Sequence, residues 1–133
     1  MKYMLMMNTM KAGVNQFPGW SEKDFQTMIA FMIKVDEDLK KSGELVFAEG
    51  LSFPDQAKLV HAGKGGIPIT DGIFPESKEF LAGFWVIDVA TPERAYEIAA
   101  YVSACPGKGG APLNMPIEVR PIMGPPPKKP HTN

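Results

Sequence analysis

The chain has 133 residues, of which 44% are hydrophobic and 22% are charged, so it is long enough for one globular domain and too short for two. Its 14 basic and 15 acidic residues give a net charge of −1, which argues against a nucleic-acid partner because phosphates require a basic surface. The single cysteine, Cys105, cannot form an internal disulfide, and no stretch reaches the ~20 apolar residues of a membrane span. We therefore expect a cytoplasmic protein with no membrane partner, no metal site and no cofactor.

The first elements are a short strand and a long helix. Residues 2–8 are apolar on both faces, which predicts a buried strand. Ser21 and Asp24 have the spacing of a capping box, and Trp20 can pack on Phe25 across the start of the helix. Apolar residues then recur at helical spacing, and Gly43 is placed to end the helix in a left-handed conformation.

The rest of the chain predicts further strands and a second helix. Apolar and β-branched runs predict strands at 45–51, 57–61, 84–89 and 117–122, with a short extended piece at 67–70. Thr91 is a natural cap for a helix that begins at Pro92. Proline suits the first helical position because an N–H group there would have no partner within the helix. This helix would bury Ala95, Ile98, Ala99 and Val102.

This order predicts an α+β fold. It is the ferredoxin-like β-α-β-β-α-β order with an extra short strand between the middle strands, which implies an antiparallel sheet with both helices on one face. We expect the domain to span 1–123 and to be followed by a flexible, Pro-rich tail at 124–133. Two helices leave the second sheet face bare, and an exposed apolar face needs a cover. We therefore predict a homodimer through that face, where apolar side chains are in excess: Met4, Met6, Val46, Phe84 and Val86.

The segment 71–79 carries the densest polar pattern. Asp71 and Gly72 form a turn signature, and three charged residues follow within four positions before an apolar strand. One interpretation is a hairpin-like loop with a solvated charged rim. The other is the edge of a pocket, in which Asp71 and Glu79 act as paired carboxylates, one donating a proton and one accepting it.

Other polar residues leave alternatives open. His61 is suited to act as a general base, although a lone histidine at a strand end is more often a surface residue. Arg120 on the last strand is suited to hold a substrate carboxylate or to pair with Glu79 or Glu118. Two similar glycine-rich turns, 63–66 and 107–110, lack the pattern of a phosphate-binding loop.

The run from Asp71 to Glu79, together with the apolar residues 80–87, resembles the signature of the YCII-related proteins. More narrowly it resembles the DGPF-domain group, in which proline stands at the position of Ile73. The segments 3–7, 93–99 and 117–121 also match, so the resemblance covers most of residues 1–123. It implies a ferredoxin-like fold that dimerises into an α+β barrel.

The resemblance also bears on activity. Some YCII-like proteins resemble small isomerases and dehydrochlorinases and carry a His–Asp pair proposed as catalytic, with the histidine at the start of the first helix. Residues 20–24 contain no histidine, so this pair does not carry over to the chain. DGPF-domain proteins also tend to occur alongside extracytoplasmic-function sigma factors.

Three functions follow as hypotheses. The first is a dimeric small-molecule-binding module whose pocket is lined by Met4, Met6, Phe84 and Trp85, with Asp71 and Arg120 as polar anchors. The second is an acid–base enzyme of isomerase or lyase type acting on a small carbonyl or lactone, with Asp71 as proton shuttle and His61 or Glu79 assisting. The third is an accessory protein associated with a sigma factor.

Overall fold

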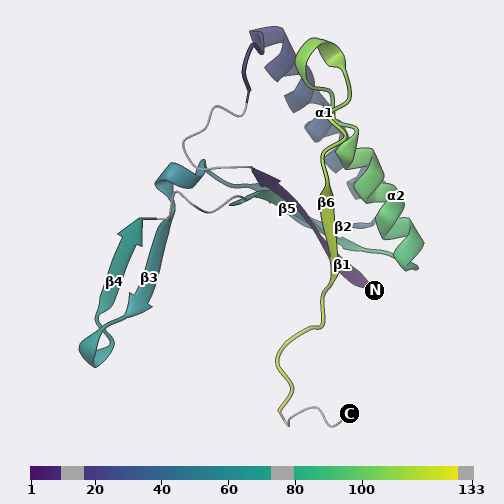
Figure 1. Ribbon diagram of the computed structural model, residues 1–133. Helices are drawn as coiled ribbons and strands as arrows, with labels where there is room; N and C mark the ends of the chain where they lie inside the picture. Colours follow the sequence, from purple (N-terminus) through teal and green to yellow (C-terminus); the bar gives the residue numbers. More distant parts are fainter. Residues whose placement is uncertain (10–16, 73–79, 129–133) are drawn as a thin grey trace.

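The computed structural model describes residues 1–9, 17–72 and 80–128 (Figure 1). Most of the segment 71–79, Glu79 included, therefore lies outside the described residues. None of the helices in this part of the chain is long and apolar enough to cross a membrane. The elements are β1 (Lys2–Thr9), α1 (Glu22–Lys41), β2 (Leu45–Gly50), β3 (Lys58–Ala62), β4 (Pro68–Gly72), β5 (Phe80–Asp88), α2 (Pro92–Ser103) and β6 (Ile117–Pro121).

Four strands form one antiparallel sheet in the order β2-β5-β1-β6. Both helices lie on the same side of this sheet (Figure 1). The prediction of an α+β fold with an antiparallel sheet and two helices on one face is therefore confirmed. These four strands and two helices also follow one another in the ferredoxin-like order β-α-β-β-α-β.

The central strands β1 and β5 are apolar on both faces. Side chains alternate along a strand, and residues paired across two strands share a face. Leu5 is paired with Trp85 on the face that packs against the helices, whereas Met4 is paired with Val86 on the opposite face. We call this opposite face the uncovered face. The core on the helix side contains Tyr3, Leu5, Val35, Leu39, Trp85, Ile87, Val89, Ala95, Ile98, Ala99 and Val102.

The inserted region differs from the prediction. Instead of one extra short strand, β3 and β4 form a separate two-stranded hairpin that pairs only within itself, from Lys58 opposite Gly72 to Ala62 opposite Pro68. Figure 1 shows this hairpin standing away from the four-stranded sheet. A tight turn is enough to bring two adjacent strands together, so the apolar runs could form strands without joining the main sheet.

The ends of α1 follow the predicted local chemistry. The Ser21 and Asp24 side chains each accept a hydrogen bond from the other residue's backbone N–H, at 3.1 and 2.9 Å. The rings of Trp20 and Phe25 lie 5.2 Å apart. At the other end Gly43 has φ of +77°, and the N–H of the next residue, Glu44, donates to the carbonyl of Leu39 at 3.0 Å. This is the Schellman ending of a helix.

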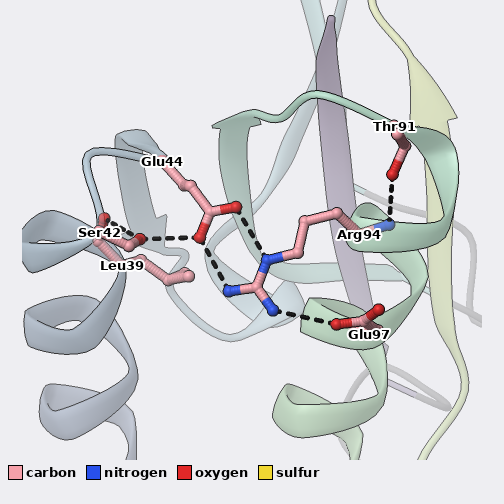
Figure 2. A network of polar contacts seen from close by, with 6 residues as sticks. All are labelled: Leu39, Ser42, Glu44, Thr91, Arg94 and Glu97. Carbon is pink, nitrogen blue, oxygen red and sulfur yellow. Dashed lines mark hydrogen bonds and ion pairs between the residues drawn. The ribbon is translucent and has the colours of Figure 1, made fainter.

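A polar network joins the start of α2 to the chain that leaves α1 (Figure 2). The Thr91 hydroxyl accepts the N–H of Arg94, as the predicted cap requires. The Arg94 guanidinium donates from Nε and from one terminal nitrogen to the two Glu44 carboxylate oxygens, at 2.9 and 2.8 Å, and also contacts Glu97. The Ser42 hydroxyl adds a third hydrogen bond to Glu44. These contacts, those from Arg94 above all, lower the pKa of Glu44 from its ordinary value of 4.5.

We expect Gly43→Ala to lower the free energy of unfolding by about 1 kcal/mol, because a side chain in the left-handed region is strained whatever its surroundings. A Cβ atom at Gly43 would meet nothing within 4 Å, so the loss would be conformational. Chemical denaturation of the two proteins measures the difference. Gly50→Ala is the matched control, because Gly50 also has an open Cβ position but lacks a positive φ. Equal losses at the two positions would contradict the expectation.

We expect Glu44→Gln to destabilise the protein by about 1 kcal/mol at pH 7, through loss of the two-point contact with Arg94. Because the pKa of Glu44 is lowered in the folded state, its contribution is present above pH 4.5 and fades as the pH falls through the folded-state pKa. Urea denaturation of both proteins at several pH values between neutral and acidic tests this. Glu97→Gln is the control, since Glu97 is more exposed and contacts a single nitrogen of Arg94. An equal loss at every pH would contradict the prediction.

Candidate functional site

A cavity of about 650 Å³ lies between α1 and the end of the sheet formed by the last residues of β2 and the first of β5. This volume is in the range of sites that hold small molecules. The wall is mainly apolar. Its aromatic residues are Phe17, Trp20, Phe53, Phe84 and Trp85, and its methionines are Met7, Met28, Met32 and Met115.

The cavity exists because small residues meet at this end of the sheet. Gly50 of β2 is directly opposite Gly83 of β5, so neither strand sends a side chain toward α1 at that point. A Cβ atom at Gly83 would lie 3.2 Å from the carbonyl oxygen of Glu49, which is tighter than ordinary contact. At the other end of the same strands Leu45 is opposite Ile87, and these larger side chains pack against the core. The change from large to small residues therefore leaves space at one end of the sheet.

Asp36 is the polar side chain that α1 adds to this wall. Met28, Met32 and Asp36 are four residues apart, so they lie on one side of the helix. The Trp85 indole Nε1 donates a hydrogen bond to Asp36 Oδ1 at 3.1 Å. Asp36 makes no other hydrogen bond within the described part of the chain, which leaves acceptor capacity for a ligand. Glu49 also borders the cavity, but the register of β2 directs its side chain to the uncovered face with Phe84.

The structure brings together some of the predicted ligand-binding residues and separates another. Met4, Met6, Phe84 and Arg120 share the uncovered face. Trp85 lies on the helix side, because adjacent residues of a strand point in opposite directions. Of the four predicted apolar residues, Phe84 and Trp85 border the cavity, whereas Met4 and Met6 lie on the uncovered face outside it.

The predicted polar residues lie away from the cavity. Arg120 Nε is 3.9 Å from Glu118 Oε2, which is one of the structural pairs expected for it. Asp71 and His61 are exposed on the hairpin, where their partners across the strands are Leu59 and Ile69. This register puts Asp71 and His61 on the same hairpin face as diagonal neighbours. Their catalytic assignment stays a prediction, and the pairing of Asp71 with Glu79 falls outside the described residues.

Cys105 is fully buried, and burial raises the pKa of its thiol to about 11. A buried thiol with a raised pKa packs as a small apolar residue and is not a reactive nucleophile. The described residues contain no group of three or more His, Cys, Asp or Glu side chains that could hold a metal ion.

Sequence reasoning missed Asp36 and saw Met28 and Met32 only as apolar residues that recur at helical spacing. The available signal was a carboxylate in line with two methionines on the apolar side of an amphipathic helix. A charged residue at such a position needs a partner, and Trp85 supplies one through its indole N–H.

Comparison with known proteins identifies a family but no characterised relative. No curated protein matches the chain. The family model of the YCII-related domain matches residues 1–107, which contain all the elements from β1 to α2. Beyond that match, β6 completes the sheet by pairing with β1. The chain therefore belongs to the YCII-related family.

Proposed function

We propose that this chain binds a small, mainly apolar molecule in the cavity between α1 and the sheet. The observation that carries the proposal is the wall itself, in which aromatic rings and methionines surround a single inward-facing carboxylate, Asp36. Binding sites for small molecules are commonly apolar clefts with a few placed polar groups that fix orientation. Methionine is suited to such a wall because its flexible thioether adapts to ligands of different shape.

The polar group narrows the class of ligand. An Asp36 carboxylate can only accept hydrogen bonds, so it favours a ligand with a hydroxyl or N–H donor. It disfavours a carboxylate, because like charges close together in an apolar site repel. We therefore infer a neutral or cationic aromatic or alicyclic ligand with one donor group.

Binding is better supported than acid–base catalysis. The described lining residues include no histidine, lysine, arginine or cysteine, and the other titratable residue among them, Glu49, has its side chain directed by the register of β2 to the uncovered face, away from Asp36. Two groups with separated pKa values are the usual requirement for acid–base catalysis. The enzymatic and sigma-factor hypotheses stay as alternatives without a specific observation in their favour.

We expect 4-phenylphenol to bind the protein, and Gly50→Phe to weaken its binding by about tenfold or more, because the new ring would occupy the cavity. A Cβ atom at Gly50 meets nothing within 4 Å, so this residue can be enlarged without a backbone clash. Isothermal titration calorimetry measures the dissociation constants. Ala100→Phe is the control, since Ala100 is exposed on α2 and outside the cavity. Unchanged affinity in Gly50→Phe would place the ligand elsewhere.

The same titration with 4-phenylbenzoate tests the role of Asp36. We expect the carboxylate to bind at least about tenfold more weakly than the phenol, and Asp36→Asn to reduce that preference. Asn keeps an acceptor oxygen for the Trp85 indole, so the fold of the site is retained. A preference for the carboxylate in the unaltered protein would contradict the assignment of Asp36.

We further propose that the chain forms a homodimer through the uncovered face, as two sheets closing into an α+β barrel. Phe47 and Phe84 pack edge to face there with ring centroids 5.5 Å apart, and 49% of Phe47 is exposed. Met4 and Met6 extend the same apolar surface across β1. A contiguous apolar patch on a sheet is typical of a protein interface.

We expect Phe47→Glu to shift the protein from dimer to monomer, because a charge would be buried between the two sheets. Sedimentation equilibrium or light scattering after size exclusion measures the mass. Tyr96→Glu is the control, because Tyr96 is at least as exposed as Phe47 but lies on α2, on the helix side. A monomeric unaltered protein at high micromolar concentration would refute the proposed dimer.

A further inference from the structure

The sequence Gly-Lys-Gly-Gly-x-Pro occurs twice, at 63–68 and at 107–112. We call these the arm turn and the body turn. Both close with a 2.7 Å hydrogen bond from the N–H of the first glycine to the carbonyl of the residue before proline. The residue before each turn is paired with its proline, as Ala62 with Pro68 and as Pro106 with Pro112. The φ angles agree within two degrees: +69° and +80° at Gly65 and Gly66, and +67° and +81° at Gly109 and Gly110.

An aliphatic residue follows each proline and folds back over the first glycine. A Cβ atom at Gly63 would lie 2.8 Å from the Ile69 side chain, and one at Gly107 would lie 2.5 Å from the Leu113 side chain. The two segments therefore share both the backbone conformation of the turn and the aliphatic side chain that covers its first glycine.

The body turn shows what this unit binds. The Gly109 N–H donates a hydrogen bond to Asp24 Oδ1 at 3.1 Å. Trp20 lies against the same turn, with its ring 3.2 Å from a Cβ position at Gly107, and packs on Phe25. Successive backbone N–H groups in a right-handed then left-handed conformation form a concave site for anions. In this chain the turn receives the Asp24 carboxylate, and the Trp20 ring lies against the same turn.

The arm turn has no such contact within the described part of the chain. It forms the tip of the hairpin β3–β4, which we call the arm (Lys58–Gly72). Four large aliphatic side chains of the arm are 43 to 68% exposed: Leu59, Val60, Ile67 and Ile69. A lone two-stranded hairpin is at best marginally stable in water, so an arm with apolar residues exposed on both faces needs a partner.

The uncovered face offers the same chemistry that the body turn binds. Glu49 is paired with Phe84, whose ring packs on Phe47, so this carboxylate is bordered by two aromatic rings. The two other acids of that face in the described chain already have partners, because Glu118 lies 3.9 Å from Arg120 and Asp88 lies 3.0 Å from the N-terminal ammonium group of Met1. The arm carries two lysines and one acidic residue, Asp71, which is paired with Leu59 at the base of the hairpin, so the arm turn with Lys64 complements Glu49 in charge.

We propose that the arm of one copy of the chain docks on the uncovered face of a second copy, with the arm turn seated on Glu49 of that copy. The aliphatic side chains of the arm would then cover part of the apolar surface around Phe47 and Phe84. This inference rests on the proposed homodimer and adds to it a second, reciprocal contact at the edge of the interface.

Disulfide trapping between two singly substituted proteins tests the contact. Lys64→Cys, carrying a size tag, is mixed with untagged Glu49→Cys under a glutathione redox buffer, and the mixed species is quantified on a non-reducing gel. A disulfide requires Cα atoms about 4.4–6.8 Å apart, so it forms only if the arm tip meets Glu49. The native Cys105 is buried and its thiol pKa is raised to about 11, which keeps it out of the reaction. Glu93→Cys, exposed on the helix side, replaces Glu49→Cys in the control mixture.

We expect a mixed disulfide yield at least about tenfold above that of the Glu93→Cys control. A yield equal to the control would overturn the docked arm. The mass of the unaltered protein, measured in parallel, distinguishes failure of the arm contact from failure of the proposed homodimer. A dimer without the mixed disulfide removes only the arm contact, whereas a monomer removes both the contact and the proposed homodimer.

Discussion

The two-sided central strand β5 is the constraint on which the rest of the structure depends. Trp85 and Ile87 face the helices and are almost fully buried, while Phe84 and Val86 face the other way. A strand that is apolar on both faces cannot lie at a water-exposed surface without leaving one row of side chains in solvent. One row is covered by α1 and α2, which fixes where the core lies. The other row is covered by neither helix. Val86 is itself buried, but Phe84 is only half-buried and its neighbour Phe47 is 49% exposed, and the proposed dimer follows from these residues.

The cavity depends on the same strand, at the position where its side chains are missing. Gly83 continues the helix-facing row of Trp85 and Ile87, and Gly50 is directly opposite. Since α1 is a continuous helix over this end of the sheet, it spans the space left by the two glycines and does not collapse into it. Trp85 then serves both the core and the cavity, because its ring packs with the core and its N–H holds Asp36.

The sequence predicted well those features that depend on interactions between residues close together in the chain. The capping box of Ser21 and the glycine that ends α1 involve contacts within a few positions, so the residues themselves contain the information. The same holds for the start of α2 at Pro92 and for the buried row of that helix. The fold class followed because the order of such elements restricts their arrangement to few topologies.

What the sequence did not predict depends on how distant segments meet. The predicted pocket joined Phe84 to Trp85 because the two are adjacent, although the pleat of the strand sends them to opposite faces. Asp36 and Trp85 are 49 positions apart, and only the packing of α1 on β5 brings them together. The hairpin strands were recognised from their composition, but composition does not reveal whether a strand joins the main sheet.

The two glycine-rich turns carry this distinction further. Identical local sequence produces the same backbone geometry at both sites, although one site is at the tip of an exposed hairpin and the other against the body of the domain. The conformation is therefore intrinsic to the turn, while the carboxylate it receives is supplied by whatever surface lies beside it. In the body turn that surface is the start of α1.

Since the cavity opens on one face of β5 and the proposed partner covers the other, ligand binding and association use alternate residues of one strand. Glu49 and Phe84 border both surfaces, but the other side chains can be changed on either face without altering the surface on the other, which makes the two proposed functions separable within a single sheet.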